Sequence, residues 1–179
     1  MKNNLVKLTG VLLLGTLALG GCKKGENDPF LSLRSRDARV TGEWKLTDYN
    51  SESTTVSSSN GTVVTSTSTA VLSSSLLTTT SGGSSFAYSF TEDLTINDDG
   101  TFTQTDVVDA QTSTTTADWT WMDDTKDKVK ISLDGSVYYI DELKNSEMVL
   151  MQTSYSKSLD STGDYTETTT TVTLTYTKQ

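Results

Sequence analysis

The side chains of this sequence support little catalytic chemistry. None of the 179 residues is a histidine, and Cys22 is the single cysteine. Nucleophiles activated by histidine, histidine metal sites, disulfides and thiolate metal sites are therefore excluded. Asp106 and Asp109 lie three residues apart, which places them on opposite faces of a strand, where they cannot act on one bond. We expect no catalytic residues and no enzyme activity.

Two acidic runs contain the residue type that a hard cation such as Ca²⁺ prefers. Asp98 and Asp99 form one run, and Asp123, Asp124 and Asp127 form the other. Neither run has the ligand spacing of a calcium-binding loop with its closing glutamate. Aspartate also hydrogen-bonds its own backbone in tight turns, which explains both runs without a metal. We expect neither a metal nor a cofactor.

Glu92 is the acid with the most unusual place in the sequence pattern. In the stretch 86–96, the even positions other than 92 are apolar. These residues are Phe86, Tyr88, Phe90, Leu94 and Ile96, and Glu92 is the one acid among the even positions. A period of two puts these side chains on one face of a strand. A lone buried carboxylate is costly unless it is paired. Glu92 is therefore expected to reach water at one mouth of the fold, or to meet a polar partner or a ligand.

Aromatic residues are the other candidates for a binding site. Trp119 and Trp121 share one face of a later strand, and with Phe86, Tyr88, Phe90 and Glu92 they make up the candidate ligand-binding set. Two interpretations remain open for the aromatic members. They fill the core, as large aromatics do in small barrels, or they line a pocket for a small hydrophobic molecule.

The elements that must position these residues are strands. Period-two patterns recur along the folded part, separated by turn sequences such as Asn60-Gly61, 97–100 and Asp134-Gly135, which are typical of hairpins. We count eight to ten strands and no convincing helix. Sequential hairpins close most economically into a barrel without exposed edges. The predicted fold class is all-β, an antiparallel up-and-down barrel of eight to ten strands.

The region 51–85 is low in complexity and rich in serine and threonine. Disordered segments are usually rich in Pro, Glu, Lys and Gln, whereas β-branched threonine favours strands. Strands with a polar outer face therefore fit this region best. Because the alternation is weak, register is poorly specified, and we expect a loose edge or a long mobile loop within 65–85.

The N-terminal segment, residues 1–21, is typical of an export signal. A charged head precedes an apolar run at 8–19 that is too short to span a bilayer. The sequence Leu19-Gly20-Gly21-Cys22 resembles a bacterial lipobox, which implies that Cys22 is lipidated and that the chain is cut just before it. An ordinary secretory leader is the alternative. Two or three acyl chains would make the membrane anchor effectively permanent.

Residues 22–40 carry the cysteine and then a charged stretch with the single proline, which reads as a tether. Three arginines within 32–39 leave a second interpretation open, a short helical turn across one end of the fold. The formal net charge of the chain is −9. An acidic chain repels phosphate backbones, so nucleic acid is not an expected partner.

The motif Gly42-x-Trp44 at the start of the folded part looks like the opening motif of the lipocalin barrel. The order of lipobox, tether, Gly-x-Trp, Ser/Thr-rich stretch and Trp-rich strand is similar to that of lipocalin-like lipoproteins of the Bacteroidota. This resemblance covers residues 41–179, the expected barrel domain, and implies that Gly42 and Trp44 close the barrel. The arginine that usually packs over this tryptophan from the last strand is absent, and Lys178 is the nearest cation.

Two functions from different classes follow. The first is a non-catalytic, lipid-anchored outer-membrane protein whose barrel binds a small hydrophobic or amphiphilic ligand, as the resemblance implies. The second is a surface-anchored interaction or structural module with a side-chain-filled barrel, whose Ser/Thr-rich loops contact protein or glycan. The membrane face, periplasmic or cell-surface, is left open, as are ligand identity and oligomeric state.

Overall fold

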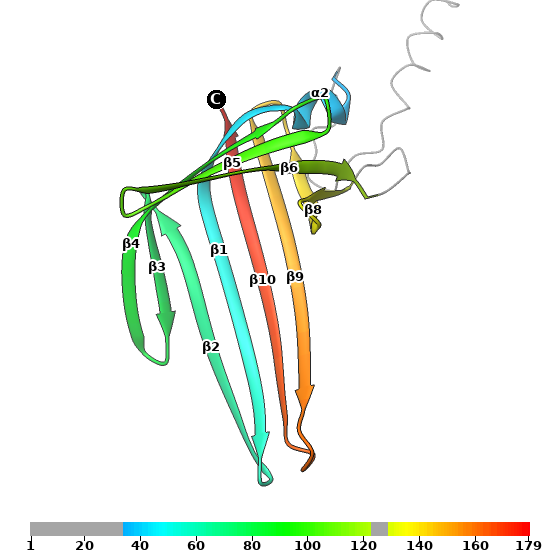
Figure 1. Cartoon of the computed structure of the whole chain (residues 1–179). Coiled ribbons are helices and arrows are strands. Elements are labelled where there is room, and N and C mark those ends of the chain that lie inside the picture. Colours follow the sequence, from blue (N-terminus) through cyan, green and yellow to red (C-terminus); the bar gives the residue numbers. More distant parts are fainter. Residues whose placement is uncertain (1–33, 123–128) are drawn as a thin grey trace, which may run out of the picture.

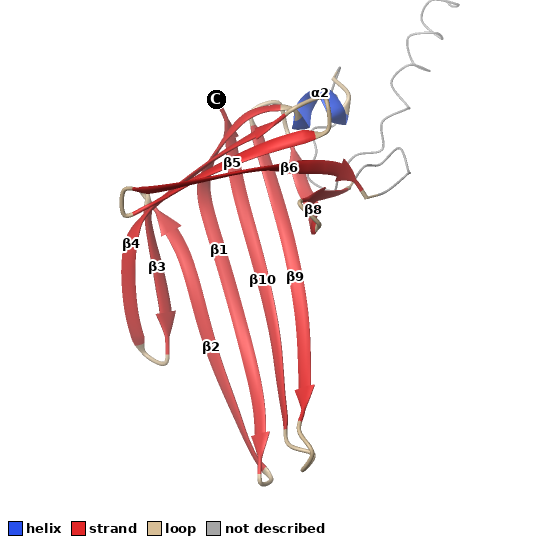
Figure 2. Ribbon diagram, in the orientation of Figure 1, coloured by secondary structure: helices blue, strands red, loops and turns tan. Residues whose placement is uncertain are grey.

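The computed structural model describes residues 34–122 and 129–179. The signal segment, Cys22 and most of the tether lie outside the described residues, as do Asp123, Asp124 and Asp127. Within the described part there is one short helix, and the rest is strands and turns (Figure 2). The elements are α2 (Arg36–Val40), β1 (Gly42–Ser59), β2 (Thr62–Ser73), β3 (Leu76–Ser81), β4 (Ser84–Ile96), β5 (Thr101–Val108), β6 (Gln111–Trp121), β7 (Lys130–Leu133), β8 (Ser136–Leu143), β9 (Glu147–Leu159) and β10 (Tyr165–Lys178).

The strands form a closed barrel in the order β1-β10-β9-β8-β7-β6-β5-β4-β3-β2 (Figure 1). Every strand pairing between described residues is antiparallel. The predicted all-β, up-and-down barrel of eight to ten strands is confirmed. All neighbouring strands are consecutive in the sequence except in the pairings of β1 with β10 and of β1 with β4.

β1 has different neighbours along its length. Its first residues pair with β4, from Gly42 opposite Ile96 to Lys45 opposite Asp93. From Asn50 onward the same side of β1 pairs with β2 instead, while β10 follows its other side throughout. β1 and β4 therefore separate, and the hairpin of β2 and β3 fills the space between them.

Several connections are tight two-residue turns. Asn60-Gly61 has φ values of 50° and 77°, and Asp134-Gly135 has 47° and 77°, as expected for turns that match the twist of the strands. Ser74-Ser75 and Asp109-Ala110 make the same kind of turn without glycine, with φ between 46° and 68°. The long mobile loop expected within 65–85 is wrong, because β2 and β3 run almost without a break through the Ser74-Ser75 turn.

Helix α2 covers one end of the barrel, so the helical interpretation of the tether's end is the one the structure shows. Ser35 caps the helix, its Oγ accepting from the backbone nitrogen of Ala38 at 3.2 Å. Arg39 and Val40 are buried, and Arg39 Nη1 donates to the carbonyl of Leu143. Trp44 Nε1 donates to the carbonyl of Val40 at 2.7 Å. The helix is thereby fixed to both β1 and the end of β8.

Lys178 completes this end of the barrel. Its Nζ lies 4.8 Å from the centroid of the Trp44 ring and donates to the carbonyls of Arg39 at 3.1 Å and Thr41 at 2.6 Å. The sequence analysis found no arginine in the last strand and named Lys178 as the nearest cation, and Lys178 is the residue that lies over Trp44. A lysine takes the place of the arginine, where it caps the carbonyls at the end of α2 and contacts the aromatic face.

Gly42 is required by two features of the same corner. Its φ is +128°, a backbone conformation that L side chains rarely adopt, and a Cβ built on it would lie 2.6 Å from Lys178 Cε. Trp44 beside it is fully buried. Gly42 and Trp44 therefore stand where the two ends of the sheet meet β1, which fits the barrel-closing role assigned to them.

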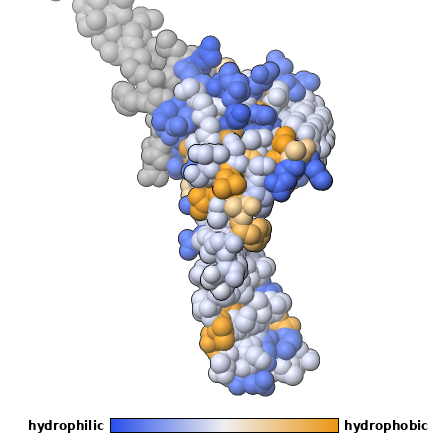
Figure 3. Space-filling model, turned by 90° about the vertical axis from the view of Figure 1, so that its left-hand side faces the viewer, coloured by the Kyte–Doolittle hydropathy of each residue, from blue (hydrophilic) through white to orange (hydrophobic). Residues whose placement is uncertain are grey.

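Beyond the barrel, four strands continue as one layer. Residues 53–59 of β1, 62–68 of β2, 154–159 of β9 and 165–170 of β10 pair side by side in the order β2-β1-β10-β9, and none of them is buried. We call these residues the single-layer extension. Figure 3 shows it as a narrow, pale column below a wider head. The buried apolar residues lie in the barrel instead, and Trp44, Leu94, Ile131, Ile140 and Leu150 are among the least exposed.

Cross-strand hydroxyl pairs connect β1 and β10 in the extension. Thr55 and Thr168 are opposite each other, with their Oγ1 atoms 3.1 Å apart, and Thr170 Oγ1 donates to Ser53 Oγ at 3.0 Å. Such pairs each contribute roughly 0.2–1 kcal/mol. They hold the layer together without a core.

Substitution of Lys178 tests the closure of the barrel. Lys178→Met retains apolar bulk but leaves the carbonyls of Arg39 and Thr41 without this donor and removes the cation over Trp44. We expect a loss of about 1–3 kcal/mol in the free energy of unfolding, measured by urea denaturation. Lys45→Met, on the exposed face of β1, is the matched control and should change stability by less than about 0.5 kcal/mol. Equal stability of the two variants would contradict the assigned role of Lys178.

Candidate functional site

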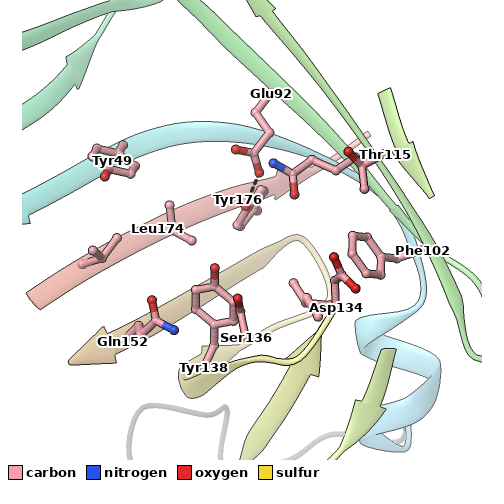
Figure 4. A pocket seen from close by; sticks show the side chains of 13 residues that line it. Tyr49, Glu92, Phe102, Thr115, Asp134, Ser136, Tyr138, Gln152, Leu174 and Tyr176 are labelled. Atoms are coloured by element: carbon pink, nitrogen blue, oxygen red, sulfur yellow. Dashed lines mark hydrogen bonds between the residues drawn. The ribbon is translucent and has the colours of Figure 1, made fainter. Parts of the chain in front are cut away.

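A cavity of about 390 Å³ lies in the barrel interior (Figure 4). It is bounded by side chains of β1, β4, β5, β6, β8, β9 and β10, together with the β7–β8 turn. Its lining residues are Tyr49, Glu92, Phe102, Gln104, Thr115, Leu133, Asp134, Ser136, Tyr138, Gln152, Val172, Leu174 and Tyr176. The alternation along each strand turns these side chains inward. The barrel is therefore filled at the end beneath α2 and hollow toward the extension.

Glu92 and Tyr176 form the buried polar pair of this cavity. Glu92 is 7% exposed and Tyr176 is 2% exposed. The Tyr176 hydroxyl donates to Glu92 Oε1, and Figure 4 shows the two side chains pointing toward each other. They come from β4 and β10, the strands that flank the first residues of β1. The polar partner expected for Glu92 is thus a tyrosine of β10, while the carboxyl group also borders the cavity.

The environment of Glu92 disfavours its charged form. Burial raises its pKa from the usual 4.5 to about 7; the hydrogen bond from Tyr176 opposes this, and the negative charges of Asp106 and Asp93 add to the increase. The pKa of Tyr176 is raised well above its usual value, chiefly by burial and by the charge of Glu92. Near neutral pH the tyrosine therefore stays a neutral donor, while the carboxyl group changes between its protonated and ionised forms.

The remaining lining combines hydrogen-bonding groups with apolar surface. Tyr49 and Tyr138 present ring faces and hydroxyls, and Gln104 and Gln152 present amides. The pKa of Tyr138 is raised by burial, with contributions from Glu92 and Tyr49. The charged residues of the lining are Glu92 and Asp134, and the described part of the chain places no lysine or arginine on the cavity wall. The cavity can therefore offer acidic and neutral polar contacts to a guest.

Of the predicted ligand-binding set, only Glu92 lines this cavity. Trp119 and Trp121 meet edge to face, with ring centroids 5.7 Å apart, and both are packed against the hydrophobic core. Trp119 Nε1 donates to the carbonyl of Asn97, and Trp121 Nε1 donates to Asp37 Oδ1, each at 2.7 Å. Their rings therefore pack the core, and their indole nitrogens are bonded near the α2 end.

The three aromatic residues of β4 also lie away from the cavity lining. Tyr88 and Phe90 pack against the core, whereas Phe86 is 63% exposed and stacks on Tyr88 with centroids 6.2 Å apart. The alternation was read as one continuous buried face, but the start of β4 pairs with β3 in the hairpin that leaves the barrel wall. No barrel interior lies behind Phe86. The alternation of apolar and polar residues therefore extends to Phe86, although the side chain there is exposed.

The sequence analysis did not identify most of the cavity residues. The alternation in the last strand shows that Val172, Leu174 and Tyr176 share one face. The residues of other strands that these side chains contact depend on the strand register, which the sequence pattern does not give. Tyr49 lies opposite Leu174, and Glu92 is opposite Asp106. Tyr138, Gln104 and Gln152 carry no motif that singles them out.

The acidic turn at 98–100 has the backbone role expected of it. Asp99 Oδ1 accepts from the backbone nitrogen of Thr101 at 2.9 Å and from its hydroxyl at 2.7 Å. Within residues 34–122 and 129–179, no group of three or more His, Cys, Asp or Glu side chains is arranged to hold a metal ion. The same residues contain no helix long and apolar enough to cross a membrane.

Comparisons with known proteins leave the family of this chain open. No protein-family model and no curated protein matches it. A solved structure described as a polyisoprenoid binding domain from Saccharophagus degradans implicated in plant cell wall breakdown is similar, with 9% sequence identity and a TM-score of 0.26. The match covers 75% of this chain and 99% of that one. With so low a TM-score, we draw neither fold nor ligand from that neighbour.

The raised pKa of Glu92 makes stability depend on pH. The folded chain keeps its proton up to about pH 7, whereas the unfolded chain releases it near 4.5. Stability conferred by the protonated carboxyl group is therefore present below pH 4.5 and falls as pH rises to 7, by about 3 kcal/mol at most. Glu92→Gln cannot ionise, so its free energy of unfolding should decrease less than that of the wild type over this range. Parallel pH profiles in urea denaturation would contradict the assignment.

Proposed function

We propose that the protein is a non-catalytic binding protein, which takes a small amphiphilic molecule into the barrel cavity. The observation that carries this proposal is the buried Glu92–Tyr176 pair on the cavity wall. A buried carboxyl group with one oxygen engaged by a tyrosine retains a second oxygen for another partner. The polar group of the ligand would bind there, and its apolar part would contact Leu133, Val172 and Leu174.

The charges around the cavity favour one class of ligand. Glu92 and Asp134 line the cavity, Asp106 lies close enough to raise the pKa of Glu92, and no cationic side chain of the described residues is on its wall. An anionic head group would be desolvated beside like charges, which costs free energy. A neutral head group can accept a hydrogen bond from the protonated carboxyl group of Glu92, and a cationic one can pair with its carboxylate. We therefore propose a neutral or cationic amphiphile.

The dimensions of the cavity agree with this class. A volume of about 390 Å³ is near the lower end of small-molecule pockets, which span roughly 300–1,000 Å³. The ring faces of Tyr49 and Tyr138 can contact a cation, as aromatic rings do in ammonium-binding sites. The absence of histidine from this sequence argues against nucleophiles activated by histidine and against histidine-ligated metal chemistry.

We further propose that the domain is anchored in the outer membrane through lipid on Cys22. The support is the sequence Leu19-Gly20-Gly21-Cys22 behind a short apolar segment, the pattern of a lipoprotein signal. A lipid anchor would keep the cavity near a membrane, where amphiphiles are concentrated.

A matched series of ligands tests the proposed class. Octylamine, octanol and octanoate share one apolar tail and differ in the charge of the head. At pH 7.5, native mass spectrometry should detect one bound octylamine or octanol per chain and at least tenfold weaker binding of octanoate. Glu92→Gln should weaken the amine at least tenfold and change the alcohol less than threefold, because the amide keeps a polar group but cannot become a counter-ion.

One control variant accompanies this series. Glu147→Gln removes an acid at the start of β9 that is paired with Lys144 rather than lining the cavity, and it should bind all three compounds as the wild type does. Tighter binding of octanoate than of octylamine, or no binding of any of the three at millimolar concentration, would refute the proposed ligand class.

Cys22→Ser tests the proposed anchor separately. An oxygen nucleophile is not expected to replace the sulfur of a lipobox, so the variant should leave the membrane fraction, while the wild type stays there after a high-salt wash. Intact mass of the wild type from its native host should show acyl chains on a protein that begins at Cys22. A mature mass without acyl chains would contradict the anchor but leave the cavity proposal intact.

A further inference from the structure

The outer edge of β2 is open at the end of the single-layer extension. β2 pairs with β3 only from Ser68 to Ser73, whereas β1 pairs with β2 down to Thr62. Among the described residues, no strand pairs with the other side of residues 62–67. The backbone groups on that side are positioned to pair with another strand.

The side chains of this edge favour pairing and do not oppose it. The segment 62–67 reads Thr-Val-Val-Thr-Ser-Thr, so five of its six residues are valine or threonine, which favour strands. Val63 is 58% exposed and Val64 is 60% exposed, and as neighbours in a strand they point to opposite faces. Natural edge strands are usually protected by charges, prolines or bulges. None of these is present in residues 62–67.

Other open edges among the described residues differ in nearby charge or in apolar surface. Residues 84–88 of β4 pair with β3 on one side and with no described strand on the other, but Asp109 lies beside this edge, where its Oδ1 accepts from the backbone nitrogen of Ser89 at 3.0 Å. At the far side of the extension, β9 carries Lys157, which forms an ion pair with Glu167 and lies 5.0 Å from the ring of Tyr165. The edge of β6 at residues 111–117 is uncharged, but it presents mainly hydroxyls and one glutamine. The β2 edge therefore combines the lack of charge with exposed valines.

The charge of the whole chain identifies the partner that this edge fits. A second copy has the same formal charge of −9, so two copies repel except where they meet across an uncharged surface. The longest stretch without a charged residue runs from Ser53 to Thr91 and contains all of β2. A second β2 therefore places no charge opposite this edge, whereas β1, β5, β8, β9 and β10 of a second copy each carry charged residues.

We propose that two copies of this chain associate through their β2 edges, which pair antiparallel about a twofold axis within residues 62–67. Antiparallel pairing of a strand with its own copy is self-complementary, as a twofold interface requires. It joins two single-layer extensions into one continuous sheet and covers Val63 and Val64 with their symmetry-related neighbours. The interface is separate from the cavity, so its failure would not affect the proposed ligand.

Single-cysteine cross-linking of the full chain in mild detergent locates the axis. Each residue from 62 to 67 is replaced in turn by cysteine, and the protein is oxidised. Each step away from the axis moves a residue and its copy apart by about 6.8 Å along the strands, twice the rise per residue. A disulfide needs Cα atoms about 4.4–6.8 Å apart. We therefore expect most of the chain to cross-link at one or two adjacent positions, with a sharp decrease on either side.

Two controls accompany the scan. The wild type reports any cross-linking through Cys22, and Thr114→Cys reports chance encounters at the uncharged β6 edge; both should stay monomeric on non-reducing gels. Cross-linking that is equal at all six positions, or at position 114, would overturn the proposal.

Two lysine variants test the association without cross-linking. Val63→Lys places like charges at the edge of β2, and native mass spectrometry in detergent should show a loss of dimer of at least tenfold. Val71→Lys adds the same charge to the same strand where β2 is covered by β3, at a residue that is 42% exposed, and should leave the dimer unchanged. A wild-type chain that is monomeric at tens of micromolar would contradict the proposal.

Discussion

The corner where Lys178 covers Trp44 joins the two ends of the sheet. The first residues of β1 pair with β4 on one side and with β10 on the other, and Lys178 holds the last carbonyls of α2 above them. Gly42 leaves the space that the lysine occupies. β1 and β4 are paired at this corner and separate further along β1, where β2 takes the place of β4. The β2–β3 hairpin, the cavity and the extension all lie beyond this separation.

Within the hollow part of the barrel, burial of one carboxyl group sets the chemistry. Glu92 gains a hydrogen bond from Tyr176 but no cationic partner among the cavity residues, so its proton is held until about pH 7. A neutral carboxylic acid beside two further tyrosines and two amides is suited to a polar group that is uncharged or positive. The same residues are poorly suited to a carboxylate or a phosphate, which would meet only acidic charge.

Alternation and turn chemistry predicted the barrel, its strand count and the turns at Asn60-Gly61 and Asp134-Gly135, because these signals are local. The turn at Ser74-Ser75 was missed because neither residue is typical of positive φ. Glu92 could be singled out as an acid on an apolar face. Tyr176 could not be named as its partner, since that contact joins residues far apart in the sequence. Phe86 lies on the same face of β4 as Tyr88, as the alternation predicted, yet its side chain is exposed. Alternation predicts which face of a strand a side chain is on, but not whether another part of the barrel covers that face.

The ionisation of Glu92 is the most direct test of the account. Carbon-13 NMR of the side-chain carboxyl group, followed from pH 4 to 9 with and without octylamine, would report its pKa in both states. The account predicts a pKa near 7 in the free protein and a clear decrease when the amine is bound, because a cation stabilises the carboxylate. A free value near 4.5 that octylamine does not change would contradict the central claim that this buried acid is the recognition group of the cavity.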